Sequence, residues 1–296
     1  MIILEAAEHG MCFGVRDALA ILDRTADPTA VTIHGELVHN GEVLRELDRR
    51  GFRRTAEAER PLPATPTVMV TAHGISERER HRLTAAGKVL VDTTCPLVQK
   101  AHEAAQALQQ EGRRVIVIGR PGHVEVRGIV EDLDRPIVVG APGDVTTWPE
   151  RRLGVLCQTT TRAATAVAIV AAIRAANPHA DVCYRDTICS PTKARVQALD
   201  DLLPRIDGLV VVGGIDSNNT RQLAMTATNA GVDAIRIESA DQLNPSWLHG
   251  RRVVGLTAGT STPDRTIAAV RDRLRWLAGS RPTLPADRGG VPDKEA

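Results

Sequence analysis

Residues 209–219 read LVVVGGIDSNN: four aliphatic residues, two glycines and then a polar tip that ends in Asn218 and Asn219. The same order is found at 67–74, which read TVMVTAHG, and at 115–123, which read VIVIGRPGH. Each aliphatic run suits a buried strand, and the Ala- and Leu-rich amphipathic stretches between such runs are typical of βα units around a parallel sheet. The sequence therefore predicts an α/β protein whose polar tips lie at the carboxyl ends of strands, where ligands bind in such folds.

Two segments of the sequence each occur a second time in similar form. DTTCP at 92–96 is echoed by DTICSP at 186–191, and RRLGVLCQTT at 151–160 is echoed by RRVVGLTAGTS at 251–261. Such echoes indicate duplicated modules that meet at a shared centre, and 296 residues are enough for two or three modules. Apolar residues at helical spacing predict helices at about 97–111, 161–176, 193–204 and 264–278.

The composition excludes several classes of protein. Aromatic residues make up only 2% of the chain and the formal net charge is +1, so the sequence lacks the stacking platforms and the cationic excess that nucleic-acid binding needs. The longest apolar runs fall far short of the ~20 residues that span a bilayer. The first residues, MIILEAAE, contain two acids and no basic residue, unlike a signal peptide. We therefore expect a cytoplasmic protein with no membrane segment and no nucleic-acid partner.

The five cysteines are an odd number and are widely spread, which argues against a disulfide framework. Pro96 places Cys95 at or beside a helix N-cap, where free amides and the helix dipole stabilise a thiolate. Cys189 has a related setting, and Cys12 lies in a glycine-flanked turn between a predicted strand and a helix. Cys157 and Cys183 lie in or near strand-like segments, so we expect them to serve packing alone.

Two interpretations of the three corner cysteines compete. They are either ordinary partly buried thiols, or ligands from three modules that converge on one metal centre. Three thiolates without a nearby fourth ligand suit an iron–sulfur cluster with one open iron, or less often zinc. Closely spaced cysteine pairs, which structural zinc prefers, are missing, and so is the second half of the zinc deaminase signature that His123 and Glu125 begin.

One module per cysteine gives an expected division into residues 1–94, 95–188 and 189–279. Residues 280–296 have no periodicity and are expected to form a flexible or wrapping tail.

Polar residues at the other strand and loop tips form a shell that is rich in hydrogen-bond donors and poor in carboxylates, which suits a phosphate or diphosphate. Its members are His39, His73, His123, Thr159, Ser217, Asn219 and Ser261. Neither a P-loop nor a dinucleotide-binding glycine motif occurs. Glu125 is the acidic member of the set, either a proton donor beside a reduced centre or part of a surface ion pair.

These residues, in this order, resemble the 4-hydroxy-3-methylbut-2-enyl diphosphate reductase family of the non-mevalonate isoprenoid pathway. The resemblance covers about residues 10–264, nearly the whole chain. The matching segments are CFGV at 12–15, ELVHN at 36–40, TAHG at 71–74, DTTCPLV at 92–98, GRPGHVEV at 119–126, QTT at 158–160, DTIC at 186–189, SNNT at 217–220 and TAGTSTPD at 257–264.

The resemblance implies three pseudo-equivalent α/β modules in a trefoil around a central 4Fe–4S cluster. It implies cluster ligands at Cys12, Cys95 and Cys189, and proton delivery by Glu125 with Thr159. It places the substrate diphosphate on His39, His73, His123, Thr159, Ser217, Asn218, Asn219 and Ser261. The implied reaction is the two-electron reductive dehydroxylation of (E)-4-hydroxy-3-methylbut-2-enyl diphosphate to isopentenyl and dimethylallyl diphosphates, with a ferredoxin or flavodoxin as electron donor.

Two positions depart from the family pattern: Val124 stands where the family usually has Pro, and Asn218 replaces a frequent Ser. Two alternatives stay open at this point. One is a paralogue that acts on a related allylic diphosphate, and the other is a non-catalytic iron–sulfur or zinc protein that binds a phosphorylated ligand. The presence of Glu125 and Thr159 favours an enzyme, because binding alone needs neither.

Overall fold

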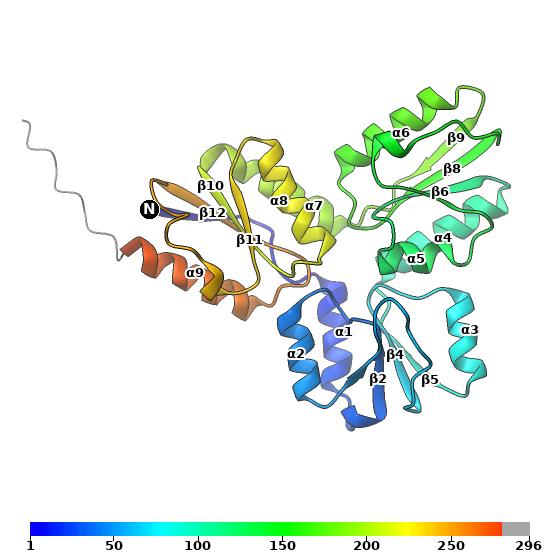
Figure 1. Cartoon of the computed structure of the whole chain (residues 1–296), viewed down its shortest axis with the longest axis horizontal. Helices are drawn as coiled ribbons and strands as arrows, with labels where there is room; N and C mark the ends of the chain where they lie inside the picture. Colours follow the sequence, from blue (N-terminus) through cyan, green and yellow to red (C-terminus); the bar gives the residue numbers. More distant parts are fainter. Residues whose placement is uncertain (280–296) are drawn as a thin grey trace, which may run out of the picture.

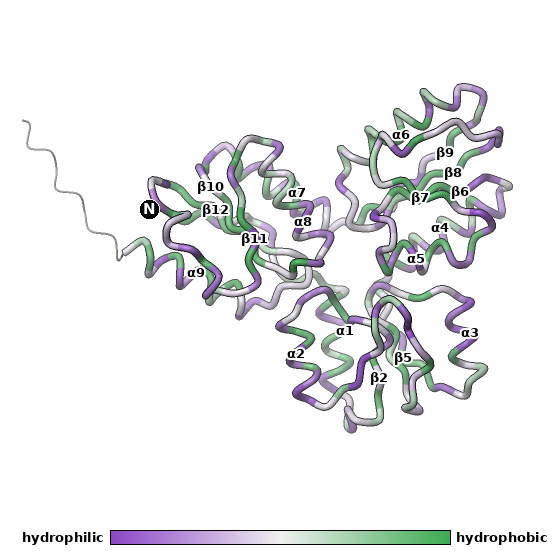
Figure 2. The backbone as a smooth tube through the Cα atoms, in the orientation of Figure 1, coloured by the Kyte–Doolittle hydropathy of each residue, from purple (hydrophilic) through white to green (hydrophobic). Residues whose placement is uncertain are grey.

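The computed structural model describes residues 1–279, which form three α/β lobes around a common centre (Figure 1). Each lobe is built on one four-stranded parallel sheet, as the sequence pattern predicts. Short aliphatic strands occupy the middle of each lobe, and more polar helices surround them (Figure 2). The predicted α/β class and three-module architecture are therefore confirmed.

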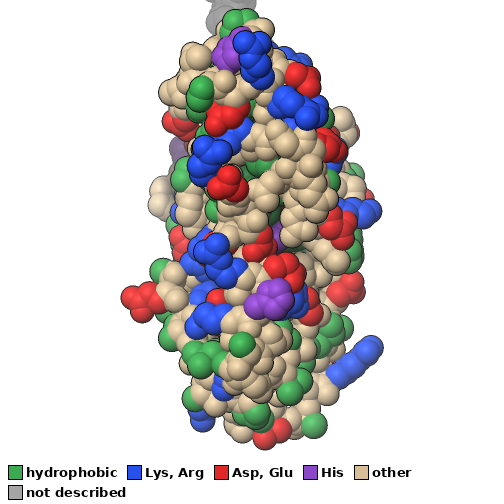
Figure 3. All heavy atoms as spheres, turned by 90° about the vertical axis from the view of Figure 1, so that its right-hand side faces the viewer, with side chains coloured by type: hydrophobic (Ala, Val, Ile, Leu, Met, Phe, Trp, Pro, Cys, Tyr) green, Lys and Arg blue, Asp and Glu red, His purple; other side chains and the backbone are tan. Residues whose placement is uncertain are grey.

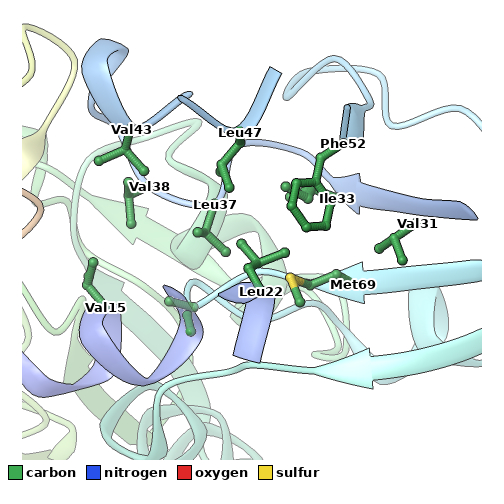
Figure 4. Close-up of a cluster of buried hydrophobic side chains, with 12 residues drawn as sticks. Val15, Leu22, Val31, Ile33, Leu37, Val38, Val43, Leu47, Phe52 and Met69 are labelled. Atoms are coloured by element: carbon green, nitrogen blue, oxygen red, sulfur yellow. The ribbon is translucent and has the colours of Figure 1, made fainter. Parts of the chain in front are cut away.

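The first sheet has the order β3-β2-β4-β5. Its elements are α1 (Phe13–Asp23), β2 (Val31–His34), α2 (Gly41–Arg49), β3 (Arg53–Arg54), β4 (Thr67–Val70), α3 (Glu77–Ala85) and β5 (Val89–Asp92). Leu22 of α1, Leu47 of α2 and Ile33 of β2 meet in one buried cluster (Figure 4). Leu37 and Met69 fill the space between them, so this core is mainly aliphatic.

The second sheet has the order β7-β6-β8-β9. Its elements are α4 (Pro96–Gln110), β6 (Arg114–Ile118), α5 (Val124–Val130), β7 (Ile137–Val139), β8 (Arg152–Cys157), α6 (Ala163–Ala176) and β9 (Asp181–Arg185). Two separate hydrophobic clusters form here, one that includes Ile169 of α6 and one that includes Leu108 of α4. Ile116 and Val117, two consecutive residues of β6, belong to different clusters. Because consecutive side chains of a strand point to opposite faces, both faces of the sheet are covered.

The third sheet has the order β1-β12-β10-β11. Its elements are β1 (Ile2–Glu5), α7 (Ser190–Leu202), β10 (Gly208–Val212), α8 (Asn218–Asn229), β11 (Ala234–Ile237), β12 (Val253–Ala258) and α9 (Asp264–Gly279). Short 3-10 helices at Pro28–Ala30, Pro142–Asp144, Leu203–Arg205 and Ala240–Gln242 connect elements of the three modules.

The position of β1 corrects the expected boundary of the first module. β1 pairs with β12, Ile2 opposite Val253, and therefore belongs to the third sheet and not to a module of residues 1–94. The physical reason is that β1 covers β12, a strand with five buried residues out of six, and local sequence periodicity does not say which edge a strand will cover. The expected tail at 280–296 lies outside the described residues.

With β1 in the third sheet, the three modules have matching strand orders. β5, β9 and β1 are the edge strands beside β4, β8 and β12, respectively. Each of these edge strands leads to a corner cysteine, and the helix after that cysteine packs in the next module. The chain therefore crosses between modules at Cys12, Cys95 and Cys189, which brings all three cysteines to the junction.

The surface and the helices carry two further observations. On the face that the first and second modules share, basic and acidic side chains are interspersed, so this face has no continuous cationic surface (Figure 3).

Among residues 1–279, no helix combines the length and the apolar character needed to cross a bilayer.

Candidate functional site

A cavity of about 50 Å³ lies at the junction, and all three modules contribute to its wall. Seven of the eight residues predicted to hold a diphosphate line it, together with Glu125. They are His39 and His73 from the first module, His123 from the second, and Ser217, Asn218, Asn219 and Ser261 from the third. Thr159, the eighth, is not in the wall, where its neighbour Thr160 takes its place.

The three histidines form one cluster although they come from distant parts of the chain. The rings of His39 and His73 are stacked, with centroids 4.7 Å apart. The ring of His123 meets both edge-on, at 5.2 Å from His39 and 5.7 Å from His73. The three imidazole rings therefore face one another across the module boundaries and form one wall of the cavity.

The orientation of His123 follows from the start of α5. His123 is the N-cap residue, and its Nδ1 accepts a hydrogen bond of 3.1 Å from the backbone N–H of Glu125. Burial and the charges of His39, Arg120 and Arg221 lower the pKa of His123 to about 3, so the ring is neutral near pH 7. Its proton then sits on Nε2, which makes that atom a donor. Val124 fills the first helical position, and α5 begins there without the usual Pro.

The other two histidines differ in their partners. His39 Nδ1 lies 3.0 Å from Glu36 Oε2, a contact that fixes the ring. Burial, followed by the charges of His39 and His123, lowers the pKa of His73. His73 Nδ1 is buried and finds no hydrogen-bond partner among the described residues.

The third module supplies hydroxyl and amide groups. Ser217 is the N-cap of α8, and its Oγ accepts from the backbone N–H of Thr220 at 3.3 Å. Asn219 Oδ1 accepts from the N–H of Thr260 at 3.0 Å, whereas its Nδ2 is buried with no partner in the described part of the chain. Because an unpaired buried donor is costly, Asn219 Nδ2 is a donor that a ligand in this cavity could use.

Asn218 lies where the second and third modules meet. Its Nδ2 donates to Thr160 Oγ1 at 2.9 Å, and its Oδ1 accepts from Arg221 Nη2 at 3.2 Å. Both ends of the amide are therefore engaged by protein groups. Asn218 lines the central cavity but bridges two modules, which the sequence did not predict.

Glu125 is an almost completely buried acid, 1% exposed. Its Oε1 accepts a hydrogen bond of 2.6 Å from the backbone N–H of Thr159. Burial raises the pKa of Glu125 to about 7, against hydrogen bonds from Thr159 and Gln158 that lower it. Thr159 thus contacts the acid and not the cavity, and its carbonyl accepts from the N–H of Cys189. A carboxyl group with this pKa can donate a proton near neutral pH.

The three corner cysteines are the N-cap residues of α1, α4 and α7, which confirms the prediction for Cys95 and the expected strand-to-helix corners, and all are half-buried. Burial raises the pKa of the Cys95 thiol, although the backbone N–H groups of Leu97 and Val98 lower it. Burial also raises the pKa of Cys189 to about 11. The backbone N–H groups expected at the helix starts are present, but in the chain alone burial raises the pKa of these two thiols more than the N–H groups lower it. A bound metal would lower the pKa of both thiols again.

Electrostatic interactions and the close packing at Gly14 place these thiols near one another. Cys12 and Glu125 both act electrostatically on Cys95 and on Cys189. A Cβ atom at Gly14 would lie 2.6 Å from Cys95 Sγ, so only glycine at this position leaves room for that thiol. Cys157, by contrast, is fully buried with its Sγ 3.5 Å from the hydroxyl of Tyr184, and Cys183 packs at the edge of a core cluster.

Arg195 of α7 is a functional candidate that the sequence did not reveal. Its side chain is 4% exposed, and it lies within electrostatic reach of Cys12 and Cys189. It donates to the carbonyls of Pro191 and Gly10, but across residues 1–279 its Nε has no partner and no carboxylate pairs with it. An arginine in an amphipathic helix normally reaches solvent, so the pattern gave no signal for a buried one.

A buried cation needs nearby negative charge, and three thiolates around a metal centre would supply it. This observation, the space at Gly14 and the three thiols are what one expects of a cluster site. No group of three or more His, Cys, Asp or Glu side chains in the described structure could hold a single metal ion. Because a cluster is larger than one ion, its ligands stand farther apart than those of a single ion.

Comparison with known proteins shows the family. The LytB protein family model matches residues 3–275. A relative in Ralstonia nicotianae is 34% identical over 291 residues, which cover 96% of this chain and 89% of the relative. A second relative, in Polaromonas sp., is 36% identical over 281 residues, which cover 93% of this chain and 84% of the relative. Both are named 4-hydroxy-3-methylbut-2-enyl diphosphate reductase.

Two solved structures share the fold. One is the E-1-hydroxy-2-methyl-but-2-enyl-4-diphosphate reductase from Plasmodium falciparum, with a TM-score of 0.83, 26% identity, and coverage of 92% of this chain and 87% of that one. The other is an (E)-4-hydroxy-3-methyl-but-2-enyl diphosphate reductase described as the terminal enzyme of the non-mevalonate pathway, with a TM-score of 0.63, 30% identity, and coverage of 93% and 100%. Together with the family match over nearly the whole chain, these similarities establish that the chain belongs to the LytB family of 4-hydroxy-3-methylbut-2-enyl diphosphate reductases.

Proposed function

We propose that this protein is an oxidoreductase that removes the hydroxyl group of (E)-4-hydroxy-3-methylbut-2-enyl diphosphate and yields isopentenyl and dimethylallyl diphosphates. The observation that carries the proposal is the junction itself. There a donor-rich cavity for a diphosphate adjoins a buried acid with a pKa of about 7 and three converging cysteines. The relatives' names state this substrate and this class of reaction.

The substrate diphosphate binds in the central cavity. His123 Nε2 and Asn219 Nδ2 donate to its oxygens, because these groups line the cavity and have donor capacity left. The hydroxyl of Ser261 makes a long hydrogen bond of 3.5 Å to the carbonyl of His39 and exchanges it for one to the diphosphate. His39 and His73, whose rings are stacked, complete the shell. Asn218 takes part through the bridge to Thr160, which sets the distance between the second and third modules.

Cys12, Cys95 and Cys189 hold a 4Fe–4S cluster. When bound, such a cluster would supply electrons and Lewis-acid character for removal of the hydroxyl group. Arg195 provides the positive charge that offsets the cluster thiolates. Gly14 keeps the space that Cys95 needs.

Glu125 delivers the proton on which departure of the hydroxyl depends. The N–H of Thr159 holds Oε1, so the proton resides on Oε2. The reaction consumes two electrons and two protons: one proton leaves with the hydroxyl as water, and the other is added to the carbon chain. The electrons come from an external carrier of the ferredoxin or flavodoxin kind.

Anaerobic purification followed by iron and sulfide analysis tests the cluster, and turnover with a chemical reductant tests the reaction. We expect about four irons per chain and formation of both products from the named substrate. A cluster-bearing protein that converts only another allylic diphosphate would instead be a paralogue. A protein that binds the substrate without converting it would be a sensor, and either outcome would overturn the proposal.

A further inference from the structure

A second cavity, of about 230 Å³, lies between the second and third modules beside the central one. Arg120 and Arg221 line it, together with Thr161 and Thr165. Asn218 belongs to the walls of both cavities, so the two are neighbours. None of the roles described so far uses the two arginines.

The two guanidinium groups come from different modules. Arg120 follows β6, and its Nη1 donates to the carbonyl of Asp216 at 3.4 Å across the module boundary. Arg221 lies in the first turn of α8, and its Nη2 donates to Asn218 Oδ1. Arg221 Nε is buried and without a partner in the part of the chain that the structure describes.

No carboxylate of residues 1–279 pairs with either arginine. Asp144, near the cavity wall, is engaged instead by the backbone N–H groups of Gly140 and Ala141, both at 2.9 Å. Arg236 adds a third positive charge, and burial together with Arg120 and Arg236 lowers the pKa of Arg221. Like charges gathered without a counter-charge cost free energy that a bound anion would offset.

We propose that this second cavity is an anion site that binds a phosphoryl group between Arg120 and Arg221. Planar guanidinium groups match phosphoryl oxygens in geometry as well as charge, and the threonine hydroxyls add further donors. The site is distinct from the shell of histidines, and its existence does not depend on the reaction proposed above. The ligand is either a free phosphate ion or the headgroup of a diphosphate ester.

Calorimetric titration of the anaerobic, cluster-loaded full chain with sodium diphosphate tests the proposal. We expect two binding events. Arg120→Gln should weaken one event about 10- to 100-fold, the effect of losing a charge-assisted hydrogen bond. It should weaken the other event, whose His123 feels the charge of Arg120, much less. His39→Ala should show the opposite selectivity. Because Arg120 is exposed, its replacement does not endanger folding.

Arg174→Gln is the matched control: it removes an exposed arginine of α6 and should leave both events unchanged. A single binding event in the parent protein would overturn the proposal, and so would an Arg120→Gln variant in which both events keep their affinity or weaken equally. Titration of His39→Ala with isopentenyl diphosphate and with inorganic phosphate separates the two sources. An ester that binds at least as tightly as inorganic phosphate assigns the site to headgroups, and an ester that fails to bind assigns it to the free ion.

Discussion

At the scale of single residues, Glu125 combines near-complete burial with a pKa of about 7. As the proposed acid it acts only when protonated, so kcat should fall as the pH rises through about 7. Glu125→Gln keeps the shape but removes the acid, and kcat should drop about 10²–10⁴-fold with little change in KM. Steady-state kinetics with a chemical reductant over this pH range provide the measurement. Near-parent kcat in the variant would assign the proton to another group.

The same residue links stability to pH. Burial raises the pKa of Glu125 above its value of about 4.5 in the unfolded chain, so between these two values the native state holds a proton that the unfolded state has lost. Stability should therefore decrease as the pH rises from about 4.5 through about 7, by on the order of 3 kcal/mol at most. Glu125→Gln should lack this decrease. Urea unfolding of both proteins at pH 5 and pH 8 measures it, and parallel changes in the two would contradict the assignment.

Arg195 should set the reduction potential of the cluster. Its buried positive charge beside Cys12 and Cys189 favours an added electron, so Arg195→Gln should lower the potential. Arg195→Lys keeps the charge and serves as the control, with a potential closer to that of the parent. A redox titration followed by absorbance gives the answer without turnover. Equal potentials in the Gln and Lys variants would show that Arg195 acts on structure alone.

At the scale of elements, the starts of α1, α4 and α7 distinguish the three proposed ligands from the other two cysteines. Cys→Ser at position 12, 95 or 189 should lower iron content after anaerobic reconstitution, because each thiol stands at a helix start at the junction. Cys157→Ser and Cys183→Ser should keep their iron and serve as matched controls. Loss of iron from the Cys157 variant, with retention in the Cys95 variant, would reverse the assignment.

Most elements could be predicted from local sequence. The helices expected at 97–111 and 264–278 are α4 (Pro96–Gln110) and α9 (Asp264–Gly279), because apolar spacing and proline at a helix start are local signals. Sheet membership is not local, so the pairing of β1 with β12 could not be predicted. The same limit applies to the site. Strand tips identified the histidines, but the burial of Arg195 and the bridging position of Asn218 depend on how modules pack.

At the scale of the whole molecule, the central cavity depends on close approach of the first and third modules. A Cβ atom at Gly214 would lie 2.0 Å from the carbonyl oxygen of His39, so Gly214→Ala must push the two modules apart. We expect diphosphate to bind at least several-fold more weakly while the cluster is retained. Gly143→Ala is the control, since a Cβ there meets nothing within 4 Å. Calorimetry on both variants measures the effect, and unchanged affinity in Gly214→Ala would show that the contact does not shape the cavity.

The pairing of β1 with β12 also has a consequence for synthesis on the ribosome. Ile2 is among the first residues made, and its partner Val253 follows 251 residues later (253 − 2). At about 5–20 residues per second, β1 waits roughly 10–50 s for its neighbour. Throughout this interval Cys12 is translated but the third sheet beside it is incomplete. The proposed cluster site therefore lacks its third-module surroundings until synthesis is nearly finished, and the nascent chain carries β1 as an unpaired strand.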